Sequence, residues 1–102
     1  MSTDLLTDPV VDAVYAAALE LHPQVALRPE PFGALAYHYG NRRLVFLKHH
    51  DVVAVVRCLH EHPSVGAALD ACGVAPERRP SFARAIASLQ SSEILVQREV
   101  AR

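Results

Sequence analysis

The feature that most restricts how this chain can fold is a pair of strand-like segments separated by only two residues. Residues 34–39 and 42–48 are rich in aromatic and branched apolar side chains, and Gly40–Asn41 lies between them. Glycine and asparagine tolerate the positive φ angles that two-residue hairpin turns require, so the pattern predicts a β-hairpin. Counting outward from this turn pairs Tyr39 with Arg42, Tyr37 with Leu44, Leu35 with Phe46, and Ala36 with Val45.

Neither face of the predicted hairpin is polar. Alternation places Leu35, Tyr37, Leu44 and Phe46 on one face, and Ala34, Ala36, Val45 and Leu47 on the other. Apolar sheet faces are normally buried, so we expect both faces to be covered. Residues 24–30 also alternate and predict a further strand, which Pro29 and Pro31 interrupt.

After the predicted sheet, the hydrophobic spacing changes to the 3.6 residues of an α-helix. Helices are expected over residues 52–62, 65–72 and 81–91. Asp51 and Ser64 are the expected N-caps of the first two, and Gly73 is the expected end of the second. The dipeptide Asp8–Pro9 predicts another short helix over residues 9–18, and residues 94–96 form an extended apolar segment.

These elements predict an α+β fold, in which a three-stranded antiparallel sheet packs on three helices. We divide the chain into an N-terminal segment with the short helix (residues 1–20), a domain (21–97) and a tail (98–102). A chain of 102 residues, 51% of them hydrophobic, suffices for one modest core but rarely for a deep substrate cavity as well. The chain is therefore not expected to be an enzyme.

Charge and composition disfavour several partners. Ten basic and eleven acidic residues give a formal net charge of −1, without the basic field by which most nucleic-acid-binding proteins capture phosphates. The longest apolar run, residues 13–19, is far shorter than the roughly 20 residues that span a bilayer, so no membrane partner is expected. Cys58 and Cys72 are expected to be reduced thiols in the cytoplasm.

No metal site, cofactor or catalytic motif is predicted. His60 and His62 lie on opposite sides of the predicted helix and cannot share a metal ion, whereas Cys58 and His62 are spaced to share one face. Two such groups do not complete a zinc site.

A small DNA-binding protein is an alternative, because three helices follow the hairpin and basic residues surround the third, namely Arg78, Arg79 and Arg84. The connection before that helix is longer than in helix-turn-helix proteins, and Arg84 is the only basic residue within the helix itself.

The last strand of the predicted sheet, Leu44–Lys48, is an unprotected edge. It is apolar on both faces and contains no proline, unlike the strand at the opposite edge. Such an edge offers unpaired N–H and C=O groups to another chain. A peptide can add there as a fourth strand, and the N-terminal segment or a second copy of the protein can equally pair with it. A self-associating homodimer is therefore an open alternative to peptide binding.

Two runs of sequence, LHPQVALRPEPFGAL at residues 21–35 and YHYGNRRLVFLK at residues 37–48, resemble a known family. This is the peptide chaperone family of mycofactocin biosynthesis (MftB), which is similar in turn to the peptide chaperone of pyrroloquinoline quinone biosynthesis (PqqD). The resemblance covers about residues 21–59, and the helices up to residue 96 agree in order. It implies a winged-helix-like RiPP recognition element, a domain that binds ribosomally made, post-translationally modified peptides.

The resemblance also implies a role without chemistry and without a cofactor. The chain would hold the leader segment of a precursor peptide as an added strand and present it to a radical S-adenosylmethionine maturase. The implied peptide-binding residues are Arg43, Leu44, Val45, Phe46, Leu47 and Lys48 on the edge strand, and Ser81, Arg84, Ala85, Ser88 and Leu89 on the third helix.

Two consequences of this hypothesis depend on local geometry. A proline at Val45 would block strand addition if the Val45 N–H points outward, but would break the hairpin if it points toward Tyr37 or Ala36. Residues 9–18 could pack on the core, cover the strand edge or contact a second copy of the chain. If they cover the edge, deletion of residues 1–18 should tighten peptide binding.

Overall fold

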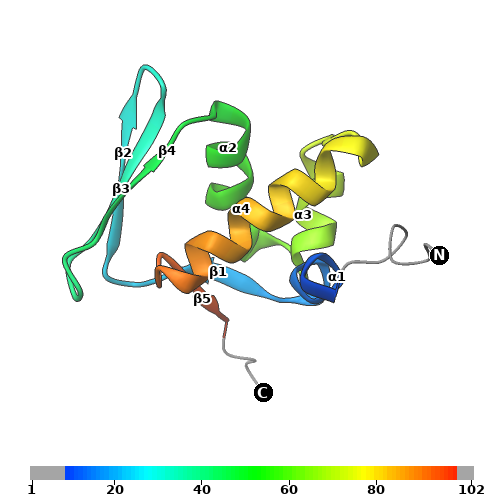
Figure 1. Ribbon diagram of the computed structural model, residues 1–102, viewed down its shortest axis with the longest axis horizontal. Coiled ribbons are helices and arrows are strands. Elements are labelled where there is room, and N and C mark those ends of the chain that lie inside the picture. Colours follow the sequence, from blue (N-terminus) through cyan, green and yellow to red (C-terminus); the bar gives the residue numbers. More distant parts are fainter. Residues whose placement is uncertain (1–8, 99–102) are drawn as a thin grey trace.

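Residues 9–98 are described by the computed structural model, and they form two small antiparallel sheets with four α-helices (Figure 1). The helices are α1 (Pro9–Ala16), α2 (His50–Cys58), α3 (Val65–Ala71) and α4 (Arg79–Ser91), with 3-10 helices η2 (Leu59–Glu61) and η3 (Pro76–Arg78). The strands are β1 (Leu19–Leu21), β2 (Val25–Glu30), β3 (Gly33–His38), β4 (Leu44–Leu47) and β5 (Leu95–Gln97). The predicted α+β class is confirmed.

The larger sheet is the predicted meander, with strand order β2–β3–β4. β3 and β4 pair in the predicted register: Tyr37 lies opposite Leu44, Leu35 opposite Phe46, and Ala36 opposite Val45. β4 is therefore an edge strand of this sheet within the described part of the chain.

The turn between β3 and β4 differs from the predicted two-residue turn. Arg42, rather than Gly40 or Asn41, has the positive φ, at 65°. The Arg42 N–H donates to the His38 carbonyl at 2.7 Å, so the turn spans four residues, 39–42. The His38 side chain explains the difference, because its Nδ1 accepts the N–H groups of Gly40 at 3.0 Å and Asn41 at 3.1 Å.

Only one face of the larger sheet is covered, although both were predicted to be. Ala34, Ala36 and Leu47 are buried on the face toward the helices. On the opposite face, Leu44 and Phe46 are 53% and 54% exposed. The four helices of the described region all lie on the same side of this sheet (Figure 1), which leaves the outer face open.

The second sheet, β1 paired with β5, was not predicted. Leu21 lies opposite Leu95, and the buried side chains of Leu19 and Leu95 close the core under α4. The predicted helix over residues 9–18 ends at Ala16, where the chain turns into β1. β1 therefore crosses the boundary that the sequence suggested between residues 20 and 21.

Arg98 was assigned to the tail, but it is anchored to the body of the protein. Its backbone N–H donates to the Ala18 carbonyl at 2.8 Å, next to the β1–β5 pair. Its guanidinium donates to the carbonyls of Leu59 at 3.0 Å and His62 at 2.7 Å. Residues 99–102 of the predicted tail lie outside the described residues.

Several helix ends differ from prediction. α2 begins at His50, so Asp51 lies within the first turn and pairs with Arg78 at 3.0 Å instead of capping the helix. The helical segment predicted over 52–62 changes to the 3-10 helix η2 after Cys58, and α4 begins at Arg79 rather than 81. The ends of α3 are as predicted: Ser64 Oγ accepts the Ala67 N–H at 3.1 Å, and Gly73 follows the helix with a φ of 71°.

Residues 9–16 do not cover the β4 edge. α1 packs against α3 and α4, far from the larger sheet (Figure 1), and buries Val11 and Val14 in the core. The hypothesis that this helix covers the edge is therefore wrong, and deletion of residues 1–18 would remove part of the core. Residues 1–8 lie outside the described residues. Between residues 9 and 98, no helix is long and apolar enough to cross a membrane.

Candidate functional site

The backbone groups of β4 point alternately toward β3 and away from the sheet. The His38 N–H donates to the Arg43 carbonyl at 2.9 Å. Hydrogen-bonded pairs alternate along an antiparallel ladder, so the N–H and C=O groups of Val45 and Leu47 are directed at β3. Those of Leu44 and Phe46 are directed outward. β4 thus presents donors and acceptors at Leu44 and Phe46 to a further strand.

The direction of these N–H groups decides where a proline would block strand addition and where it would break the hairpin. The Val45 N–H is directed inward to Ala36, its partner on β3. A proline at Val45 would therefore break the hairpin, and a proline at Phe46 is the change that blocks the outer edge.

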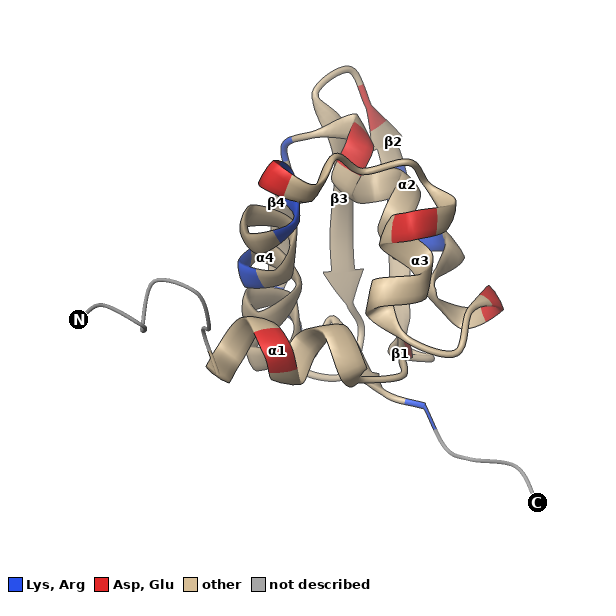
Figure 2. Cartoon of the chain, turned by 90° about the vertical axis from the view of Figure 1, so that its right-hand side faces the viewer, with Lys and Arg blue, Asp and Glu red and all other residues tan. Residues whose placement is uncertain are grey.

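A groove lies between β4 and the helical layer. Two adjoining hollows, of about 300 and 360 Å³, share His49, Val52 and Ala85. The walls come from β4, from the first turn of α2 and from one side of α4, and β4 and α4 lie on the same side of the molecule (Figure 2). An edge strand and an adjoining groove are thus combined in one site.

Eight of the eleven predicted residues line this groove: Val45, Phe46, Leu47, Lys48, Ser81, Ala85, Ser88 and Leu89. Leu44 lies on the outer face of the sheet, where it lines a different hollow. Arg43 and Arg84 are exposed beside the groove. The structure therefore brings the two predicted segments together, although they are far apart in sequence.

Sequence reasoning missed the contribution of α2. His49 and Val52 line both hollows, and neither is among the predicted peptide-binding residues. The sequence contained a signal for this contribution, namely the short link between the strand and the next helix. A helix that starts this close to β4 must begin at the end of the groove. Phe82 and Arg78 were also missed, and the Arg78 guanidinium lies 5.1 Å from the centre of the Phe82 ring.

The β4 side of the groove is basic. Arg43 and Lys48 are exposed at the two ends of β4. Blue segments gather on this side of the molecule in Figure 2. Asp51 is paired with Arg78, which leaves Glu77 as the acidic residue that lines the far end. The charge along the groove thus favours an anionic partner at the β4 side.

The apolar surface continues around the edge onto the outer face of the sheet. The rings of Phe32 and Phe46 are stacked with centres 5.7 Å apart. Tyr37 and Tyr39 pack edge to face at 4.8 Å, beside a hollow of about 390 Å³ that also includes Leu44. A strand added to β4 would therefore meet apolar side chains on both of its faces.

The site lacks the groups of a metal centre. Among residues 9–98, no three His, Cys, Asp or Glu side chains are close enough together to hold a metal ion.

An open strand edge beside an apolar groove is the arrangement of domains that recognise extended peptides by strand addition. The model of the peptide chaperone MftB family matches residues 18–96, and the chain therefore belongs to this family. A peptide chaperone is a non-catalytic accessory protein, which confirms that the chain is not an enzyme.

Three relatives carry the name peptide chaperone MftB. The chain is 49% identical over 79 residues to the protein of Mycobacterium ulcerans, covering 78% of this chain and 72% of the relative. It is 51% identical over 76 residues to the protein of Mycolicibacterium smegmatis, covering 74% of each. It is 46% identical over 79 residues to the protein of Mycobacterium tuberculosis, covering 78% and 72%. No solved structure matches the chain significantly.

Proposed function

We propose that this protein is a chaperone of mycofactocin biosynthesis that binds the leader segment of a ribosomally made precursor peptide as a strand added to β4. The observation that carries the proposal is the outward direction of the Leu44 and Phe46 backbone groups beside the groove. The family of peptide chaperones supports a peptide as the partner. The bound peptide would be presented to a radical S-adenosylmethionine maturase in the cytoplasm, where the precursor is made.

Strand addition determines which peptide side chains enter the groove. Residues of the added strand opposite Val45 and Leu47 point toward α4, and residues opposite Leu44 and Phe46 lie on the outer sheet face. The wall that the first set meets is small and apolar at Ala85. We therefore expect apolar residues at alternate positions of the leader segment.

The basic side of the groove adds a second requirement. Arg43 and Lys48 flank the edge on which the peptide would lie, so acidic residues beside the apolar positions would be attracted to it. Such rim charges act mainly on the association rate and are screened by salt. We expect the leader segment to be acidic as well as alternately apolar.

The test is a proline at the outward-directed position. In Phe46→Pro, the loss of one outward N–H should reduce binding of a fluorescently labelled leader peptide at least about tenfold. The matched control is Phe46→Ala, which removes the same exposed ring but keeps the N–H. Fluorescence anisotropy gives the affinity, and thermal unfolding shows whether both variants remain folded.

Equal affinities for Phe46→Pro and Phe46→Ala, with both proteins folded, would contradict strand addition at β4. Val45→Pro serves as the opposite control, because its N–H belongs to the hairpin. That variant should lower the unfolding temperature even without peptide.

The same edge could pair with β4 of a second copy. Peptide addition and self-pairing would use the same N–H groups of Leu44 and Phe46, so they exclude each other. Light scattering on the protein alone should give the mass of a monomer. A dimer that the peptide fails to dissociate would favour self-association instead.

A further inference from the structure

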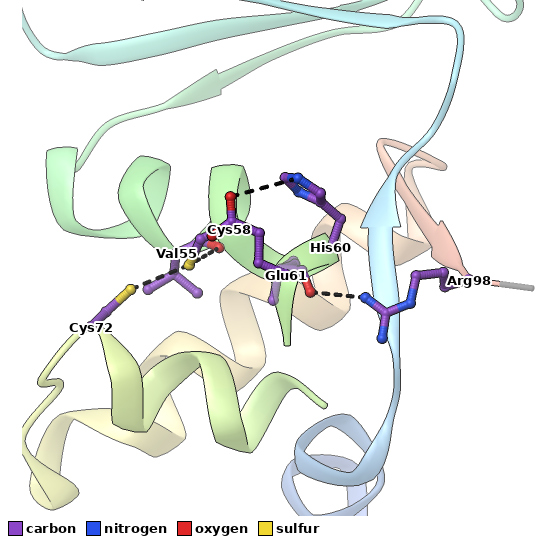
Figure 3. Close-up of polar contacts among 7 residues, drawn as sticks. Val55, Cys58, His60, Glu61, Cys72 and Arg98 are labelled. Carbon is purple, nitrogen blue, oxygen red and sulfur yellow. Dashed lines mark hydrogen bonds and ion pairs between the residues drawn. The ribbon is translucent and has the colours of Figure 1, made fainter. Parts of the chain in front are cut away.

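Cys58 and Cys72 lie at the ends of two neighbouring helices with their sulfur atoms facing each other. Cys58 is the last residue of α2, and Cys72 is the C-cap of α3. Their Sγ atoms are 3.4 Å apart, and Figure 3 shows the two thiols in contact between the helices. Both cysteines are free thiols, and Cys72 is exposed. The sequence had suggested a shared face only for Cys58 and His62, so this contact is a finding of the structure.

We propose that Cys58 and Cys72 are a dithiol modification site, which low-molecular-weight disulfides oxidise to an intramolecular disulfide. A disulfide bond is about 2.05 Å long, so the sulfur atoms must approach by about 1.4 Å. Cys72 is exposed, so its side chain has room to turn toward Cys58.

The exchange proceeds in two balanced steps. The exposed Cys72 loses its proton, and its thiolate attacks one sulfur of the small disulfide, whose other half leaves as a thiolate. The Cys58 thiolate then attacks Cys72 Sγ, and the second half of the small molecule leaves as a thiolate. The two protein thiols are oxidised, the small disulfide is reduced to two thiols, and the two protons end on the leaving groups.

The surroundings of Cys58 control the second step. Burial, then the hydrogen bond to Cys72 and the charge of Cys72, raise the pKa of the Cys58 thiol to about 11. Cys58 is therefore protonated at neutral pH and attacks slowly, and the rate of disulfide formation should rise between about pH 7 and 9.

The Cys58–Cys72 disulfide would join the end of α2 to the end of α3, at the opposite end of α2 from His49 and the groove.

The test is to incubate the native full chain in mixtures of reduced and oxidised glutathione. The remaining thiols are then blocked, and the mass of the protein is measured. We expect both thiols to disappear together, with the loss of two hydrogen atoms per chain and no dimer. The oxidised protein should unfold about 10 °C higher than the reduced protein.

Two serine variants test the order of the steps. Cys58→Ser should accumulate one glutathione adduct on Cys72, whereas Cys72→Ser should form an adduct on the half-buried Cys58 far more slowly. The proposal would be overturned if both thiols stayed free in oxidised glutathione, if the wild-type protein carried separate adducts, or if the disulfide formed only between chains.

Discussion

Both sheets of this molecule are held together by backbone hydrogen bonds, but one is enclosed by side chains and the other has an open face and an open edge. In the β1–β5 pair, Leu19 and Leu95 are buried and Arg98 fixes the adjoining chain to η2. In the larger sheet, one face is open, and within the described residues nothing pairs with the outer edge of β4. Strand pairing that is enclosed by side chains stabilises the fold, whereas an edge left open beside a groove is available for binding.

The sharpest way to separate the two regions is to truncate one large apolar side chain in each. Leu95→Ala should lower the free energy of unfolding by about 2 to 5 kcal/mol, because it leaves a cavity in the core. Phe46→Ala should lower the free energy of unfolding by no more than about 1 kcal/mol, since that ring is 54% exposed. Urea unfolding measures both. Comparable losses in the two variants would show that the exposed sheet is part of the core.

A glycine pair tests how closely β4 must lie against β3. In Gly33→Ala, the new Cβ would overlap the backbone carbonyl of Leu47 at a φ of 149°, so β4 must move or the backbone must strain. We expect a loss of about 1 to 3 kcal/mol in unfolding free energy and weaker peptide binding.

Gly73→Ala is the matched control for this change. Gly73 also has a positive φ, but its surroundings are empty and it lies away from the groove. That variant should lose about 1 kcal/mol of stability and keep its peptide affinity. Weaker peptide binding by Gly73→Ala, or unchanged binding by Gly33→Ala, would argue against a site that depends on the position of β4.

The His38 side chain holds the turn at the tip of the larger sheet. In His38→Leu, the N–H groups of Gly40 and Asn41 lose their acceptor, which should cost about 1 to 2 kcal/mol. His38→Asn can return an acceptor near the position of Nδ1 and should recover part of that loss. Faster amide exchange at Gly40 and Asn41 in the leucine variant alone is the expected signature, and equal exchange in both would contradict the turn-capping role.

The smallest effect concerns the rim charges. Lys48→Glu should weaken peptide binding by less than about 1 kcal/mol in low salt, and the difference should shrink as salt is added. Arg57→Glu makes an equal charge change at an exposed residue of α2 away from the groove, and should weaken peptide binding less. Peptide titrations at two salt concentrations measure both. An equal response of the two variants would mean that only the net charge of the protein matters.

The hairpin register was predictable, whereas its turn was not. Counting outward from Gly40–Asn41 predicted the pairing of Leu35 with Phe46, and a four-residue turn centred on the same two residues leaves this pairing unchanged. The turn itself depends on the His38 ring, which replaces the backbone conformation that Gly40–Asn41 suggested. A side chain that bonds to the backbone of its own turn leaves no trace in the hydrophobic pattern.

Long-range contacts between short elements were the other part that could not be predicted. β1 and β5 are three residues each and lie near opposite ends of the chain, too short for alternation to show. The contact between Cys58 and Cys72 depends on how α2 and α3 cross. The open edge of β4 was easier to predict, because the lack of proline or polar residues in this strand is a local property of the sequence.

The most direct test of strand addition compares neighbouring amides of β4 by hydrogen exchange, with and without a saturating leader peptide. Without peptide, the inward-directed N–H of Val45 should exchange slowly and that of Phe46 quickly. With peptide, the amides of Phe46 and Leu44 should become protected, while Val45 changes little. If Phe46 and Leu44 continue to exchange rapidly while the peptide is bound, the peptide does not add to β4 and the central claim is wrong.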